Sequence, residues 1–172
     1  MSLVVIADPK LPQPLRRQIE AIRQQHDPNF KRVPAHFTLV FPSRTVDEAA
    51  LTAHVRIVVE KTARIRFCLR TALLVKDFLT EVFHVYLVPE EGFSALVRLH
   101  DQLYTGPLSG SLRLELPFIP HITVGAFRDG VSGKKLADEL NSQGLEMAGE
   151  LDTISVFRFD DGALTLLDEI NL

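Results

Sequence analysis

Two short stretches of the sequence each combine a histidine with a threonine two residues later. They read HFTL (residues 36–39) and HITV (residues 121–124). In a β-strand, residues two apart point to the same face of the sheet. Each stretch therefore places an imidazole and a hydroxyl side by side, while Phe37 and Ile122 point to the opposite, core-facing side.

This pair of side chains, present twice, suits the chemistry of a phosphodiester. Histidine changes its charge near neutral pH, so one of His36 and His121 can take a proton from a nucleophile while the other protonates the leaving oxygen. The hydroxyls of Thr38 and Thr123 can donate to non-bridging phosphate oxygens and stabilise the developing charge. We therefore predict that the histidines are catalytic and that the threonines bind phosphate. Such a mechanism requires neither a metal nor a cofactor.

Other polar side chains extend this candidate site. Arg44 and Arg128 follow the two motifs at the point where each strand should leave the cleft. The guanidinium fork suits a phosphate group, so we predict that both arginines bind substrate phosphate, with a solvated charge at a strand end as the alternative. Tyr86 shares strand parity with His84, and this pair is predicted to border the cleft.

These residues also have purely structural interpretations. A histidine in a strand can be a core residue paired with the backbone, and threonine favours strands in any case. The repetition of the motif favours function for His36 and His121. By contrast, His26, His54 and His100 fall on predicted helices among charged neighbours, and we expect them at the surface.

The pattern around the motifs predicts the elements that position them. Apolar runs predict strands at 2–7, 36–42, 64–76, 81–89, 118–127, 150–159 and 163–172, and helical spacing predicts helices within 14–27, 45–63, 93–104 and 133–144. Hairpin turns are expected at residues 77–80 and at 160–162. Thr45 and Glu48 fit a capping box at the start of the second helix.

The two halves of the chain repeat this order. Each reads as a strand with the H-x-T motif, then a helix, then a β-hairpin, and the two motif histidines are 85 residues apart in a chain of 172. We therefore predict an α+β class with a two-lobed, duplicated fold. Antiparallel sheets would line a central cleft with the helices outside, and residues 1–172 would form a single two-lobed domain.

Composition limits the classes of protein to consider. Hydrophobic residues make up 46% of the chain and charged residues 24%, and the net charge is −3, so no extended nucleic-acid surface is expected. The single cysteine, Cys68, suggests a reducing compartment, and no run is long enough to cross a bilayer. We expect a cytoplasmic monomer. The chain lacks H-x-H, HExxH and cysteine pairs, which disfavours a metal site, and lacks a glycine-rich phosphate loop.

HFTL and HITV resemble the paired H-x-[ST]-hydrophobic signatures of the 2H phosphoesterase superfamily, most nearly its 2'-5' RNA ligase and RNA 2',3'-cyclic phosphodiesterase branch. By position, the resemblance implies that His36 and His121 are the catalytic pair and that Thr38 and Thr123 bind phosphate. It implies hydrolysis of a 2',3'-cyclic phosphate, or reversible 2'-5' joining, with a small nucleotide or an RNA terminus as the partner. His121 would be the base for water and His36 the acid.

Three alternatives remain open on the sequence. The first is a nucleotide or RNA-end binding module that keeps the fold without turnover. The second is a cyclic phosphodiesterase acting on a non-RNA nucleotide such as ADP-ribose 1'',2''-cyclic phosphate. The third is a structural α+β protein with two incidental H-x-T pairs. After the first motif the chain reads VFPSR, which differs from the usual continuation in the bacterial ligases, so the resemblance does not specify the substrate.

Overall fold

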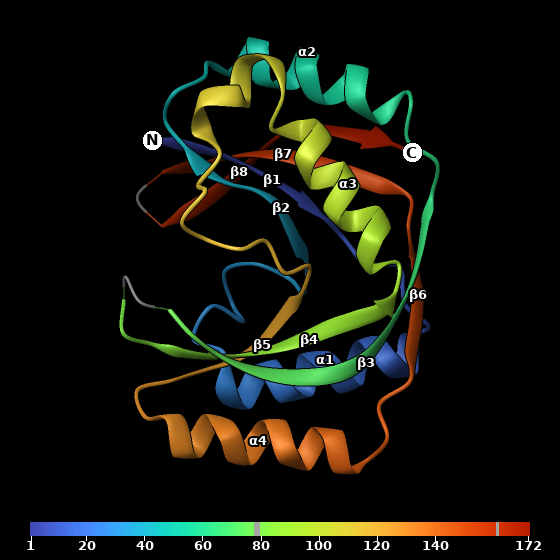
Figure 1. Ribbon diagram of the computed structural model, residues 1–172, viewed down its shortest axis with the longest axis vertical. Helices are drawn as coiled ribbons and strands as arrows, with labels where there is room; N and C mark the ends of the chain where they lie inside the picture. Colours follow the sequence, from blue (N-terminus) through green and yellow to red (C-terminus); the bar gives the residue numbers. More distant parts are fainter. Residues whose placement is uncertain (78–79, 161) are drawn as a thin grey trace.

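The strands form two antiparallel sheets of four strands each in the part of the chain that the computed structural model describes, residues 1–77, 80–160 and 162–172 (Figure 1). Sheet A has the strand order β2-β1-β7-β8, and sheet B has the order β5-β4-β3-β6. The strands are β1 Ser2–Ala7, β2 Phe37–Ser43, β3 Ile65–Lys76, β4 Phe83–Glu91, β5 Ile122–Phe127, β6 Met147–Leu151, β7 Thr153–Asp160 and β8 Ala163–Asn171. The helices are α1 Gln13–His26, α2 Glu48–Val59, α3 Phe93–Leu103 and α4 Gly130–Ser142, with a 3-10 turn η1 at Gly106–Ser111. The predicted α+β class with antiparallel sheets is confirmed.

The two strands that carry the motifs occupy equivalent places. Strand β2 is the edge strand of sheet A next to β1, and β5 is the edge strand of sheet B next to β4. Across the first pair Thr38 lies opposite Ile6, and across the second pair Thr123 lies opposite Tyr86. The motif strands do not pair with each other. Each motif thus lies on the edge strand of a different sheet.

Helices α1, α2 and α4 lie on the outer faces of the sheets, whereas α3 contacts strands of both sheets (Figure 1). Helices α1 and α4 pack on sheet B, and α2 packs on sheet A beside α3, which contacts β2. Helix α1 follows β1 of sheet A in the sequence but packs on β5 of the other sheet. This exchange ties the two lobes together, and their buried apolar side chains form one cluster.

The prediction of one continuous strand at 150–159 is wrong, because the strand is interrupted at Asp152. Residues before the break form β6 in sheet B, and residues after it form β7 in sheet A. Asp152 is buried, pairs with the ammonium of Lys10, and accepts a bond from the Leu172 N–H at 2.7 Å through its carbonyl. An apolar run predicts extended backbone but not the sheet in which it finds partners.

Both predicted hairpins are confirmed by strand pairing, β3 with β4 and β7 with β8. Within their turns, residues 78, 79 and 161 lie outside the described residues. The predicted cap at Thr45 is wrong. Asp47 caps α2 by accepting a hydrogen bond from the Ala50 N–H at 2.9 Å, because an aspartate at that position reaches the free amides of the first turn.

His100 is not at the surface, as the sequence suggested, but is 3% exposed. Its Nδ1 bonds the Leu39 carbonyl at 2.8 Å, and its ring stacks on Phe118 with 3.7 Å between centroids. The reason lies in the helical spacing, since His100 falls on the same face of α3 as Leu96 and Leu103. Charged neighbours in sequence occupy the other face.

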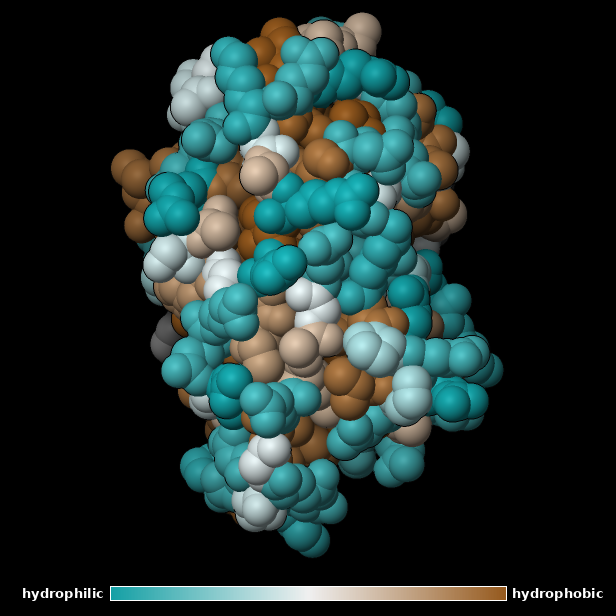
Figure 2. All heavy atoms as spheres, turned by 90° about the vertical axis from the view of Figure 1, so that its right-hand side faces the viewer, coloured by the Kyte–Doolittle hydropathy of each residue, from teal (hydrophilic) through white to brown (hydrophobic). Residues whose placement is uncertain are grey.

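On the face shown in Figure 2, hydrophilic side chains surround dispersed apolar patches. In the described residues, no helix is long and apolar enough to span a membrane.

Candidate active site

His36 and His121 are held in the same way. Each lies one residue before its motif strand, and each Nδ1 approaches the carbonyl oxygen of the residue two positions earlier. The distances are 2.8 Å from His36 to Pro34 and 2.6 Å from His121 to Ile119. Because a carbonyl can only accept, Nδ1 carries the proton in both rings. Each Nε2 is therefore the atom that can gain and lose a proton.

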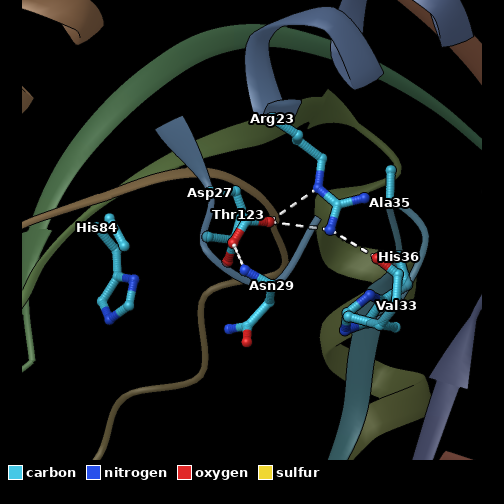
Figure 3. Close-up of a pocket in the computed structure, with 9 residues that line it drawn as sticks. Arg23, Asp27, Asn29, Val33, Ala35, His36, His84 and Thr123 are labelled. Carbon is cyan, nitrogen blue, oxygen red and sulfur yellow. Dashed lines mark hydrogen bonds and ion pairs between the residues drawn. The ribbon is translucent and has the colours of Figure 1, made fainter. Parts of the chain in front are cut away.

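The two motifs meet at a shared cleft. A cavity of about 170 Å³ is lined by His36 from one motif and Thr123 from the other (Figure 3). A second cavity of about 350 Å³ is lined by His121, and a third of about 270 Å³ by His36 and Thr38. Phe41 lines both of these larger cavities. The structure thus brings all four predicted motif residues to one region.

Arg44 and Arg128 are placed differently. Both are exposed beyond the ends of their strands, and neither lines these three cavities. Their predicted role as phosphate ligands stays a prediction. Arg113, which lines the cavity that contains His121 and forms an ion pair with Glu115, is a cation that the sequence analysis did not single out.

Tyr86 lies directly against His121. The two rings stack with 3.5 Å between centroids and an angle of 15°. On its other side Tyr86 stacks on His84 with 5.9 Å between centroids. The predicted position of this pair beside the cleft agrees with the cavities, because Tyr86 lines the one with His121 and His84 lines the one with His36.

The loop before His36 is held by Arg23, a buried residue of α1 that is 1% exposed. Its guanidinium donates to the Asp27 carboxylate and to the Val33 carbonyl at 2.7 Å (Figure 3). It also donates to the Glu20 carboxylate. Glu20 in turn accepts from the Ala35 N–H at 2.9 Å. The network therefore fixes the backbone on both sides of residue 34, whose carbonyl orients the His36 ring.

Sequence reasoning missed Arg23, although a signal was present. The apolar face of the first helix was defined by Leu15, Ile19 and Ile22, and Arg23 follows Ile19 by four residues. A charged side chain on a buried helix face needs charged or polar partners. Glu20 and Asp27, at helical spacing on either side, provide them.

Burial lowers the pKa of both motif histidines. For His121 it lowers the pKa from 6.5 to about 4, and the nearby His36 and His84 act in the same direction. The pKa of His36 is also lowered by burial, and further by Arg23, but the carboxylates of Asp27 and Asp8 oppose this shift. Carboxylates thus favour the protonated form of His36, whereas none acts measurably on His121 among the described residues, although Asp77 and Glu115 line the same cavity as His121.

Metal-ligating residues are not clustered in the described parts of the chain. Across residues 1–77, 80–160 and 162–172, no group of three or more His, Cys, Asp or Glu side chains is arranged to hold a metal ion.

Comparison with known proteins gives a consistent result. The family model described as the 2'-5' RNA ligase superfamily matches residues 11–163. A protein of Bacillus licheniformis, named only as a candidate phosphoesterase, is 25% identical over 150 residues, which cover 85% of each chain.

Solved structures share the fold. A protein of Thermus thermophilus superposes with a TM-score of 0.64 at 19% identity, covering 100% of this chain and 98% of the other. LigT of Escherichia coli, solved in complex with 3'-AMP, superposes with a TM-score of 0.56 at 21% identity, covering 99% of this chain and 97% of LigT.

Proposed function

This chain belongs to the 2'-5' RNA ligase superfamily, and from that membership and its paired histidines we propose that it is a phosphoesterase that opens a 2',3'-cyclic phosphate, in an RNA end or a small nucleotide, without a metal ion. The observation that carries the proposal is the matched pair of imidazoles. Both bind a backbone carbonyl through Nδ1, which leaves two Nε2 atoms for proton transfer.

In the proposed reaction, Nε2 of His121 takes a proton from water as the water oxygen attacks phosphorus. The bond from phosphorus to one ribose oxygen breaks, and Nε2 of His36 protonates that oxygen. One water is consumed, and the product is a phosphate monoester beside a free hydroxyl. The hydroxyls of Thr38 and Thr123 donate to the non-bridging oxygens, whose negative charge grows in the transition state. If a 5'-hydroxyl of a second nucleotide attacked phosphorus in place of water and the bond to the 3' oxygen broke, the same proton transfers would join the two nucleotides by a 2'-5' bond.

The different surroundings of the rings support this assignment of base and acid. A base must start neutral, and burial keeps His121 neutral by lowering its pKa to about 4. An acid must start protonated, and Asp27 and Asp8 favour the protonated form of His36. The Nδ1–H bond to the carbonyl is kept in both charge states of each ring. The proton therefore moves only at Nε2.

The assignment predicts a profile of kcat/KM against pH with its maximum below pH 6.5. Activity should rise as the pH passes through about 4, because His121 loses its proton there. It should fall as the pH rises through the pKa of His36, which burial holds below 6.5. Initial rates from about pH 3.5 to 8.5 at low substrate would test this. Activity that keeps rising above pH 6.5 would contradict the assignment.

The size of the substrate is supported by the relatives. LigT, which shares this fold, was solved with ATP, 3'-AMP and NADP+. The cleft here has three separate cavities of about 170 to 350 Å³ around the motif residues, which suits a nucleotide and its immediate neighbour more than a long duplex.

We expect the purified protein to hydrolyse a nucleoside 2',3'-cyclic phosphate in the presence of EDTA. The assay should compare cyclic mononucleotides, RNA ending in a cyclic phosphate, 2'-5' dinucleotides and ADP-ribose 1'',2''-cyclic phosphate, with products separated by chromatography. A 3',5'-cyclic nucleotide is the matched control, because it lacks the strained five-membered ring. If the protein binds 3'-AMP but turns over none of these four substrate classes, the chain is a nucleotide-binding module without catalytic activity.

A further inference from the structure

The cleft has two arms, each made of a motif strand and the strand that pairs with it: β2 with β1, and β5 with β4. The two arms differ in the residues of the strand paired with the motif. Register places Ile6 opposite Thr38 in sheet A and Tyr86 opposite Thr123 in sheet B. Two residues earlier on these strands, on the same face, lie Val4 and His84. One arm thus carries a valine where the other carries a histidine. Because packing is satisfied by an apolar side chain in the first arm, the fold itself does not require a histidine in the second.

His84 has no hydrogen-bond partner within the described chain. Its Nδ1 is buried and unpaired. The His84 ring stacks on Tyr86, which also stacks on His121, and this stacking fixes the plane of the His84 ring. A buried polar atom that stays unpaired costs free energy, so a group from outside the protein is the natural partner for this imidazole.

The cavity that His84 lines offers hydrogen-bond donors that the protein does not use. Figure 3 shows His84 across this cavity from His36, with Thr123 and Asn29 between them. The Thr123 hydroxyl and the Asn29 side-chain amide, like His84, have no partner in the described residues. The carboxylate here, Asp27, is already engaged by the Arg23 guanidinium and by the Asn29 N–H at 2.8 Å. Unused donors beside a satisfied carboxylate favour a ligand rich in acceptor oxygens.

We propose that His84 is a third phosphate-binding residue of this cleft, whose imidazole donates a hydrogen bond to a non-bridging phosphate oxygen of the substrate beside the Thr123 hydroxyl. This role rests on the proposed function, because it assumes that the substrate phosphate lies between the two motifs. It assigns the two arms different tasks. Behind Thr38, the paired strand offers an apolar wall of Val4 and Ile6, whereas behind Thr123 the paired strand adds His84 as a further donor to the anion.

The test uses a substitution that the molecule itself suggests. His84→Val introduces the residue that the other arm carries, and His84→Asn keeps an N–H near the position of Nδ1. We would measure binding of 3'-AMP, inorganic phosphate and adenosine to the whole protein by calorimetry, with thermal unfolding as the check on folding. His84→Val should raise the dissociation constants of 3'-AMP and phosphate by about 10- to 100-fold, the range for the loss of one hydrogen bond to a charged group. Adenosine should bind the variant and the wild type equally, and His84→Asn should recover part of the loss.

Two results would overturn the proposal. One is an unchanged dissociation constant for 3'-AMP and phosphate in a folded His84→Val protein. The other is an equal loss for adenosine, which would place the contact on the nucleoside. Because these are equilibrium measurements, they do not depend on turnover. A wild-type protein that binds 3'-AMP through His84 but hydrolyses no cyclic phosphate would refute the proposed reaction and leave this inference standing.

Discussion

His121→Ala is expected to lower kcat for a 2',3'-cyclic phosphate by about 10²- to 10⁴-fold, and His36→Ala to lower it by a similar factor. Each substitution removes the only Nε2 that serves one side of the reaction. The two losses should not multiply in the double variant, because residues that act as a unit give non-additive effects. Both rings are half-buried at the start of a strand, so alanine leaves the sheet pairing intact.

The measurement is steady-state kinetics on His36→Ala, His121→Ala and the double variant, with circular dichroism and thermal unfolding to establish that each is folded. His54→Gln is the matched control, because His54 lies on α2 and bonds the Leu103 carbonyl, away from the cleft. This control should keep the kcat of the wild type. A folded His36→Ala or His121→Ala protein with full activity is the result that would end the proposed mechanism.

Arg23→Met is expected to lower the free energy of unfolding by about 3–5 kcal/mol, the usual cost of removing one partner from a buried ion pair. The guanidinium is buried between the Glu20 and Asp27 carboxylates, and Asp27 is itself buried. Without Arg23 these two carboxylates face each other with no cation between them. The Val33 carbonyl loses its donor as well.

Urea denaturation of Arg23→Met and Arg16→Met would test this expectation. Arg16 is the matched control on the same helix, since it forms an ion pair with Asp8 in which the two side chains are 38% and 47% exposed. Its replacement should cost at most about 1 kcal/mol, because exposed ion pairs contribute little. Equal effects of the two substitutions would show that the buried network is not what holds the loop before His36. In a folded Arg23→Met protein, kcat should also fall, since the Pro34 carbonyl that orients His36 is less fixed.

The candidate site was predictable from the sequence because its chemistry is local. An H-x-T motif in an extended segment places imidazole and hydroxyl on one face by backbone geometry alone, and this holds for His36 with Thr38 as for His121 with Thr123. The same parity argument placed Tyr86 and His84 beside the cleft. Repetition of the motif predicted two similar halves of the site, and helical spacing predicted the four α-helices.

The predictions that were wrong concern residues whose environment is set by partners from other parts of the chain. The charged neighbours of His100 suggested a surface position; helical spacing groups His100 with Leu96 and Leu103, and the packing of β2 and Phe118 against that face buries it. The break at Asp152 depends on which sheet lies nearest, and its side chain is paired by Lys10 from the other end of the chain.

The sequence by itself determined which residues can do the chemistry, how the strands alternate, and that two equivalent arms exist, because these follow from local backbone periods. Only the tertiary structure decided what makes the arms unequal. In the folded protein Asp27 and Asp8 favour the protonated form of His36, and burial lowers the pKa of His121 to about 4, so the two rings differ in how readily they hold a proton. It also sets Tyr86 against His121 and leaves His84 unpaired, since stacking and burial arise between strands that only the sheets bring together.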